Sequence, residues 1–250
     1  MIAPLNTTVM WLTWRQLFAK RRIWLAAVFA LAPLFFTLVF KVVGDDGSDS
    51  RLGFFTTLNR EIVIGTLLPL AAVIFGTTAF GGEVDEGTLV YLLVKPLQRW
   101  QLVLSKFAVA VTSTLAVMLP AIFLPWLVLR GANVPAQLPL SFFVATVAGA
   151  VIYCALFLSL GLSTRRALIA GLLYVIGFES VMSRGLVGAK SFSVREFAVA
   201  IAQAVSDGAI RAPDTVVPLS TVAWMGTIML VGAMAWTMRT LVRYEPAERL

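Results

Sequence analysis

The sequence contains no histidine and a single cysteine, Cys154. These two absences exclude an intrachain disulfide, cysteine or histidine metal clusters, and nucleophilic catalysis by Ser-His-Asp or Cys-His groups. Charged residues are scarce as well, because they make up 13% of the chain against about 25% in a typical soluble domain. The composition is therefore not that of a soluble domain.

A loop that could hydrolyse ATP is also missing. Such a loop has the pattern G-x-x-x-x-G-K-[ST] between a strand and a helix. The nearest string runs from Gly185 to Ser191 and has the wrong glycine spacing. We therefore predict no catalytic residue, no resident metal and no cofactor in this chain.

Apolar residues are what the chain has in abundance. They account for 59% of its 250 residues, and the mean hydropathy is +0.89. These values indicate a membrane protein whose solvent is lipid. In a soluble protein the net charge of +7 would suggest nucleic acid as a partner, but bases near the membrane ends account for it here.

Apolar runs of membrane-spanning length recur along the chain, and a span needs about 20 residues. We predict an all-α integral membrane protein that forms one transmembrane domain over residues 1–250, with six transmembrane helices at 23–43, 62–80, 104–129, 140–162, 167–181 and 218–238.

Three other segments have their own patterns. Residues 9–22 place tryptophans on one helical face and polar residues on the other, which predicts an amphipathic interfacial helix. Residues 44–61 read as a polar loop. Residues 182–217 read as an external segment, in which the apolar stretch 197–205 is too short to span and predicts a re-entrant or interfacial helix.

Between the second and third predicted spans, carboxylates and bases gather in a short stretch that predicts a helix outside the bilayer at residues 83–99. Three acids stand where a helix N-terminus would favour them, namely Glu83, Asp85 and Glu86. Gly87 and Thr88 mark the start of this helix, and one apolar face is formed by Leu89, Leu92, Leu93 and Pro96. The alternative is an ordinary loop with a solvated charge run.

The same stretch resembles the coupling segment of ABC type-2 permeases, the membrane subunits of ATP-binding-cassette exporters. The resemblance rests on Glu86-Gly87-Thr88-Leu89, Leu92-Leu93, Lys95-Pro96-Leu97, Arg99 and Lys106-Phe107. Asp85 stands where many members carry a base. The resemblance implies that residues 83–99 form a coupling helix that docks on the ATPase, with Arg99 as its last residue.

The resemblance also implies partners and a function. A separate P-loop ATPase subunit would bind ATP and Mg, and a second permease copy, identical or similar, would complete the pathway. The cargo would be an amphipathic drug or lipid taken from the inner leaflet and moved outward. The chain would lie in the cell inner (plasma) membrane in contact with membrane lipid.

One carboxylate supports a different function. Glu179 lies 12 residues after Ala167, which is about 18 Å along a helix and deep in a membrane about 30 Å thick. An intramembrane carboxylate is a candidate transport or gating residue, with Arg184 as a possible partner. The alternative function is therefore an ATP-independent ion- or proton-coupled carrier or channel. If the helix unwinds early, Glu179 lies at the outer surface instead.

The distribution of bases predicts the orientation. Six spans place both termini on one side, and with that side cytoplasmic twelve of the 20 Lys and Arg residues lie inside and eight outside. The positive-inside rule favours this arrangement, in which both termini are cytoplasmic.

Overall fold

The computed structural model describes residues 10–14, 20–44, 47–85, 87, 98–129, 134–164, 166–179, 193–206 and 218–243. Every regular element in these ranges is a helix. The predicted all-α fold is thus confirmed for the described residues. Five helices are long and apolar enough to span a membrane: Ala26–Val43, Asp49–Val84, Arg99–Leu129, Gln137–Ser163 and Leu219–Val242. The count of six spans stays a prediction.

The first half of the chain contains one unusually long helix. It consists of α3 (Ser48–Thr57), the π-helix η1 (Leu58–Leu67) and α4 (Leu68–Asp85) in direct succession. The remaining elements are α2 (Lys20–Val43), α6 (Arg99–Leu129), α7 (Gln137–Ser163), α8 (Ala167–Leu173), η3 (Tyr174–Glu179), α10 (Val194–Val205) and α11 (Leu219–Val242).

The predicted polar loop at residues 44–61 is wrong, because helix α3 begins at Ser48. The polar residues of this segment are typical of a loop, but two aromatic contacts stabilise it as a helix. The ring of Phe54 stacks on Phe40 of α2 with centroids 4.0 Å apart. Phe55 meets Phe142 of α7 edge-on at 6.0 Å. Tertiary packing thus overrides the weak local preference.

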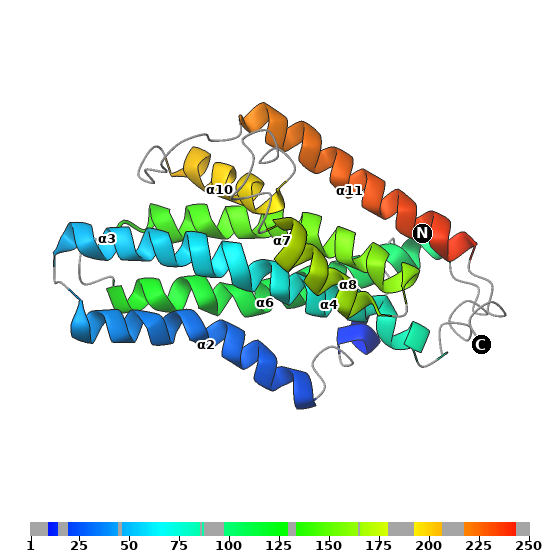
Figure 1. Ribbon diagram of the computed structural model, residues 1–250, viewed down its shortest axis with the longest axis horizontal. Coiled ribbons are helices and arrows are strands. Elements are labelled where there is room, and N and C mark those ends of the chain that lie inside the picture. The colour runs from blue at the N-terminus through cyan, green and yellow to red at the C-terminus, as the bar shows by residue number, and fades with distance from the viewer. Residues whose placement is uncertain are drawn as a thin grey trace.

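Figure 1 shows how the helices are arranged: α4, α6 and α7 form the centre, with α2 on one side and α11 on the other. The ends of the bundle differ in which elements meet there. At one end α4 ends and α6 begins, and we call this the α4–α6 end. At the opposite end α2 ends and α3 begins, and we call this the α2–α3 end.

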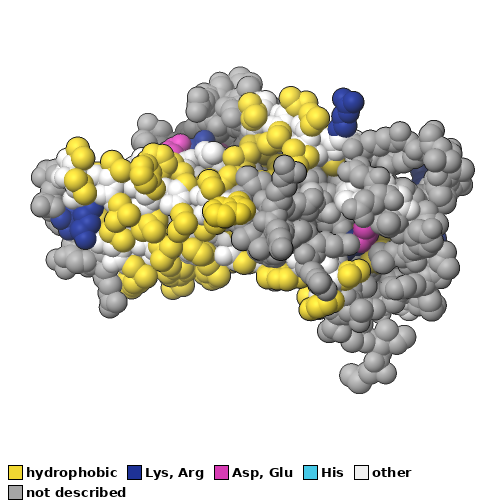
Figure 2. Space-filling view, turned by 90° about the horizontal axis from the view of Figure 1, so that it is seen from below, with side chains coloured by type: hydrophobic (Ala, Val, Ile, Leu, Met, Phe, Trp, Pro, Cys, Tyr) yellow, Lys and Arg dark blue, Asp and Glu magenta, His cyan; other side chains and the backbone are white. Residues whose placement is uncertain are grey.

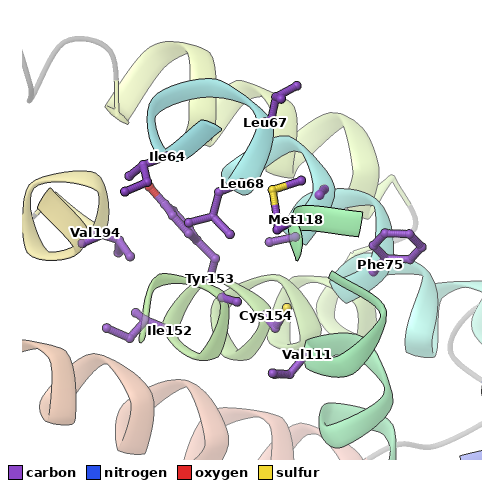
Figure 3. Packing of buried hydrophobic residues seen from close by; sticks show 14 of the residues in the cluster. Ile64, Leu67, Leu68, Phe75, Val111, Met118, Ile152, Tyr153, Cys154 and Val194 are labelled. Carbon is purple, nitrogen blue, oxygen red and sulfur yellow. The ribbon is translucent and has the colours of Figure 1, made fainter. Parts of the chain in front are cut away.

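The core lies where α4 and α7 approach each other closely. Figure 3 shows Tyr153 of α7 reaching toward Ile64 and Leu68, among side chains that are all part of one buried apolar cluster. Glycines permit this approach, as small residues do between membrane helices. A methyl group on Gly161 would lie 2.5 Å from the backbone oxygen of Thr77.

Helices α2 and α11 are peripheral and expose apolar side chains. On α2 these include Trp24, Phe35 and Val42, and on α11 they include Trp224 and Ile228. Figure 2 shows that hydrophobic side chains cover much of the described surface on the face seen there. Such a surface suits contact with lipid, as expected for a chain with the bilayer as its solvent.

Helix α10 lies within the segment predicted as external. It has 12 residues and is too short to cross a membrane. Its N-cap is Ser193, whose hydroxyl accepts a hydrogen bond from the backbone N–H of Glu196. Val194, Phe197 and Ala198 are buried, and Ala198 packs near Gly149 of α7. The helix is therefore fixed to the bundle by its apolar face.

Several element bounds differ from the sequence prediction. Helix α6 begins at Arg99, before residue 104, and α11 continues to Val242, beyond residue 238. The short fifth helix, α8 with η3, ends at Glu179. Of the predicted amphipathic helix, residues 10–14 are helical, and residues 20–22 belong to α2. The helices extend beyond the predicted apolar runs because polar and basic residues at a helix end can remain helical while their side chains extend toward the headgroups.

The close contact between α4 and α7 leads to a prediction. We expect Gly161→Ala to push the two helices apart and to destabilise the protein by about 1–3 kcal/mol, the usual cost of overpacking. Thermal unfolding of the purified chain in detergent measures this. Gly82→Ala is the matched control, because nothing lies within 4 Å of a methyl group there. Equal melting temperatures for the two variants would contradict the close packing.

Candidate functional site

The acids predicted to begin a coupling helix lie elsewhere in the structure. Glu83 and Asp85 belong to the last turn of α4, so their expected place at a helix N-terminus is wrong. Gly87, predicted to mark the start of the coupling helix, has a φ of +67°, a left-handed conformation that favours glycine and commonly follows a helix end. Its N–H donates to the carbonyl of Val84 at 3.3 Å.

Glu83 is held in this unfavourable position by an ion pair. Carboxylates are disfavoured at a helix C-terminus by the helix dipole. Lys106 of α6 compensates, because its Nζ lies 2.7 Å from Oε1 of Glu83. The lysine side chain is fully buried and the glutamate nearly so. The second carboxylate oxygen, Oε2, is buried without a hydrogen-bond partner among the described residues.

Lys106 makes two further contacts with α4. Its ammonium group donates a hydrogen bond to the carbonyl oxygen of Ala79. It also lies over the ring of Phe80, 4.8 Å from the centroid, where the face of an aromatic ring attracts a cation. One lysine therefore joins α6 to the last turns of α4 through a carboxylate, a carbonyl and an aromatic ring.

Arg99 connects α6 to the last helix of the chain. Its Nη1 donates to the carbonyl oxygens of Leu241 at 3.2 Å and Val242 at 2.9 Å. These carbonyls end α11 and have no partner within that helix. A cation at a helix C-terminus also interacts favourably with the dipole. Arg99 thus caps α11 from the first residue of α6.

Two more contacts complete a closed set of links at the α4–α6 end. The indole N–H of Trp236 in α11 donates to the hydroxyl of Ser163 in α7 at 3.1 Å. Gly161 of α7 packs on the backbone of Thr77 in α4. Helices α4, α6, α11 and α7 are therefore each joined to the next. We call this set the end ring, formed by Glu83–Lys106, Arg99–Leu241/Val242, Trp236–Ser163 and Gly161–Thr77.

The end ring brings together only some of the residues predicted from the sequence. Glu83 and Arg99 belong to it, and they flank the rest of the predicted coupling helix. Asp85 and Gly87 are described but are not part of the ring. The remaining six predicted coupling residues lie outside the described residues: Glu86, Thr88, Leu89, Leu92, Leu93 and Pro96. Whether they meet an ATPase stays a prediction.

The two candidate transport residues are not placed as a pair. Glu179 is the last residue of η3, and Arg184 lies outside the described residues. Their role also stays a prediction.

Sequence reasoning missed the partners of the two ring cations. Lys106 was part of the family motif, and its burial within an apolar stretch was the available signal that it needs a carboxylate. Arg99 had no such signal, because its acceptors are backbone carbonyls. Nor did any pattern single out Ser163 or Trp236.

Among the described residues, no group of three or more Cys, Asp or Glu is placed to hold a metal ion. The contacts of the end ring join α4, α6, α11 and α7 to one another.

Comparison with known proteins gives one match. The family model described as "ABC-2 family transporter protein" matches residues 17–179, which is more than half of the 250 residues. The matched range includes α2, the long helix, α6 and α7, together with Glu83, Arg99 and Lys106 of the end ring. No curated protein matches the chain.

The buried ion pair leads to a second prediction. Removing one partner leaves the other charge buried and unpaired, so we expect Lys106→Met to destabilise the protein by about 3–5 kcal/mol. Adding Glu83→Gln should recover most of this loss, because no charge then remains. Denaturant unfolding of both variants measures the difference. As a control, Lys41→Met on the exposed end of α2 should change stability by about 0.5 kcal/mol or less.

A double variant no more stable than Lys106→Met alone would contradict this account. It would mean that the lysine acts through Ala79 and Phe80 and not through the carboxylate.

Proposed function

Because the chain belongs to the ABC-2 transporter family, we propose that it is the membrane-spanning permease subunit of an ATP-binding-cassette exporter. A separate P-loop ATPase would bind ATP and Mg and dock on the segment between α4 and α6. One observation carries the proposal: both borders of this segment are attached to the bundle by polar contacts, Glu83 to Lys106 on one side and Arg99 to α11 on the other.

The end ring gives a route for movement from an ATPase into the bundle. A force on residues 86–98 would act first on the last turn of α4 and on the start of α6. Arg99 would pass it to α11, since its guanidinium is attached to the last carbonyls of that helix. Trp236 would pass it from α11 to α7. Four helices would then move as a coupled set.

The arrangement also supports an orientation. Described bases toward the α4–α6 end include Lys20, Arg21 and Arg22 at the start of α2, and Arg99, Lys106, Arg166, Arg239 and Arg243. We propose that this end is cytoplasmic, as the positive-inside rule favours. The ATPase would then meet its docking segment on the side where ATP is present. The membrane would be the inner (plasma) membrane.

The pathway would form between two permease copies, and the cargo would be amphipathic and move outward. The peripheral position of α2 and α11 supports this, because their exposed apolar faces are available to a second copy or to lipid. Sliding or rotation of one copy against the other would not require the core between α4 and α7 to open.

A pull-down tests the ATPase partner. We expect the tagged full-length chain, gently solubilised from its native membranes, to carry with it a P-loop ATPase identifiable by mass. Replacing Leu89, Leu92 and Leu93 with serine should release that ATPase, because the proposed docking face loses its apolar side chains. Replacing Leu219, Ile228 and Val231 of α11 with serine is the control, since these exposed residues lie on another surface. Recovery of the chain without any ATPase would refute the proposal.

A further prediction concerns Arg99. We expect Arg99→Gln to keep the ATPase bound and hydrolysing while the ATP-dependent movement of α11 is lost, because the carbonyls of Leu241 and Val242 lose their donor. The movement can be followed with spin labels on Leu140→Cys of α7 and Ile228→Cys of α11, both exposed positions. The natural Cys154 is buried and should not react with the label.

The distance between the two labels is compared with and without ATP and vanadate. Arg243→Gln serves as the control, since Arg243 is exposed at the same end of α11. An unchanged nucleotide-dependent distance shift in Arg99→Gln would show that movement does not pass through this arginine.

A further inference from the structure

Two polar side chains are completely buried where the long helix packs on α7, and neither belongs to the end ring. Asn59 lies in η1 and Thr146 lies in α7, and the relative exposure of each is 0%. Oδ1 of Asn59 and Oγ1 of Thr146 are both buried without a hydrogen-bond partner among the described residues. Burying an oxygen in this way is costly unless a donor or acceptor binds it.

The hydroxyl of Thr146 differs from those of other buried threonines. The usual partner of such a hydroxyl is a carbonyl of its own helix. Four buried threonines donate to the carbonyl oxygen four residues earlier, namely Thr37, Thr77, Thr114 and Thr237. Thr146 makes no such bond. Its hydroxyl is therefore available to a group outside its own helix.

The amide of Asn59 is oriented by one bond to its own helix. Its Nδ2 donates to the carbonyl oxygen of Phe55 at 2.9 Å. A carbonyl oxygen only accepts hydrogen bonds, so the nitrogen of the amide must face it. Oδ1 consequently points away from that carbonyl and needs a donor from elsewhere.

An aromatic contact sets the level of the two residues along the bundle. The long helix and α7 both lead from the α2–α3 end toward the α4–α6 end. The ring of Phe55 in α3 meets that of Phe142 in α7, with centroids 6.0 Å apart. Asn59 and Thr146 each follow one of these phenylalanines by four residues, which is about one helical turn. They therefore lie at the same level.

The next contact along the two helices shows which faces meet. A methyl group on Gly149 of α7 would lie 2.8 Å from Cδ2 of Leu68. Figure 3 shows Tyr153, one turn further on, reaching toward Ile64 and Leu68. Asn59 and Thr146 lie between these contacts and the phenylalanine pair, on the packed faces of both helices.

The two oxygens belong to neutral groups, and the charged side chains beside Asn59 are directed at one another. Nη2 of Arg195 in α10 lies 2.5 Å from Oε2 of Glu61, and Nε of Arg60 lies 3.6 Å from Oε1 of the same carboxylate. An amide oxygen and a hydroxyl are too few ligands for Ca²⁺ or Mg²⁺, which take about six oxygens or more. The site therefore suits a small neutral ligand.

A water molecule has the required chemistry. It can donate to Oδ1 of Asn59 and bond to the hydroxyl of Thr146 at the same time. Buried waters typically bind two to four polar groups that lack other partners. Asn59 and Thr146 form no direct hydrogen bond, and water commonly bridges polar groups that are too far apart for one. We propose that Asn59 and Thr146 bind one water molecule between the long helix and α7.

This water bridge joins the two central helices nearer the α2–α3 end, whereas the end ring joins them at the α4–α6 end through Gly161 and Thr77. The bridge goes beyond the proposed export function and does not depend on it, because it requires neither ATP nor a partner subunit.

Thr146→Val tests the site, since valine has the shape of threonine without the hydroxyl. Loss of the hydroxyl deprives the bound water of a partner, so we expect the melting temperature of the purified full-length chain in detergent to fall by about 2–4 °C. A hydroxyl without a ligand would give the opposite result, because an apolar group in its place is more favourable. An unchanged or raised melting temperature would overturn the proposal.

A second substitution tests whether the two side chains share the water. Asn59→Leu should lower the melting temperature less in the Thr146→Val background than in the unchanged chain, because the bridge is already lost there. Thr237→Val is the matched control: its hydroxyl is buried but bonded to the carbonyl of Ala233, so its effect should add to that of Asn59→Leu. Additive effects of Asn59→Leu and Thr146→Val would refute a shared ligand.

Structure determination of the purified chain, at a resolution that shows ordered water, observes the ligand directly. We expect density for one water within hydrogen-bonding distance of Oδ1 of Asn59 and Oγ1 of Thr146, and its loss in Thr146→Val. A direct hydrogen bond between the two side chains would overturn the proposal, as would apolar packing that leaves no such density.

Discussion

A charge on a membrane-spanning helix is costly unless a partner compensates it, and this constraint governs the long helix from Ser48 to Asp85. The helix carries one compensated carboxylate on each side of its central uncharged stretch. Glu61 pairs with Arg195 and Glu83 pairs with Lys106, and no charged residue stands between positions 61 and 83. Each pair joins the helix to a different neighbour, so the two pairs also fix its position relative to α10 and α6.

The two pairs differ in solvent access, and the difference fits different tasks. Lys106 is fully buried and has three acceptors or contacts on α4, so separating it from Glu83 would leave a charge without water. Such a pair adds little net stability but strongly penalises any arrangement that breaks it. The half-exposed carboxylate of Glu61 can exchange partners at low cost. The first pair therefore resists separation, whereas the second can be broken at lower cost.

An element of this fold can be predicted from the sequence when local composition determines it. It cannot be predicted in this way when contacts with distant residues determine it. The long apolar runs that led to α2, α6, α7 and α11 follow from bilayer thickness, a constraint that acts on each run alone. Helix α3 is different, since Phe54 and Phe55 stabilise it through Phe40 and Phe142 of other helices. The sequence of residues 44–61 alone consequently predicts a loop, because it does not reveal those contacts.

The candidate sites divide in the same way. The motif around Glu86 and Gly87 indicated the segment between α4 and α6, because its residue types recur at fixed spacing in one local stretch. Glu83 and Lys106 are 23 positions apart in the sequence. Arg99 and Leu241 are 142 positions apart, and Glu61 and Arg195 are 134 positions apart. No local pattern encodes such pairs, and Arg99 binds carbonyls that every residue possesses.

The intramembrane carboxylate that the sequence singled out was Glu179, chosen because it follows an apolar run. Glu61 was passed over because the polar residues before it resembled the end of a loop. Glu61 lies on a continuous helix and not in a loop, because α3 continues that helix toward the α2–α3 end, beside the apolar end of α2. Depth is a property of the packed bundle, since it depends on where neighbouring helices stop exposing apolar side chains. A carboxylate near a predicted span boundary should therefore be judged by the helix that precedes it as well as by the run that follows it.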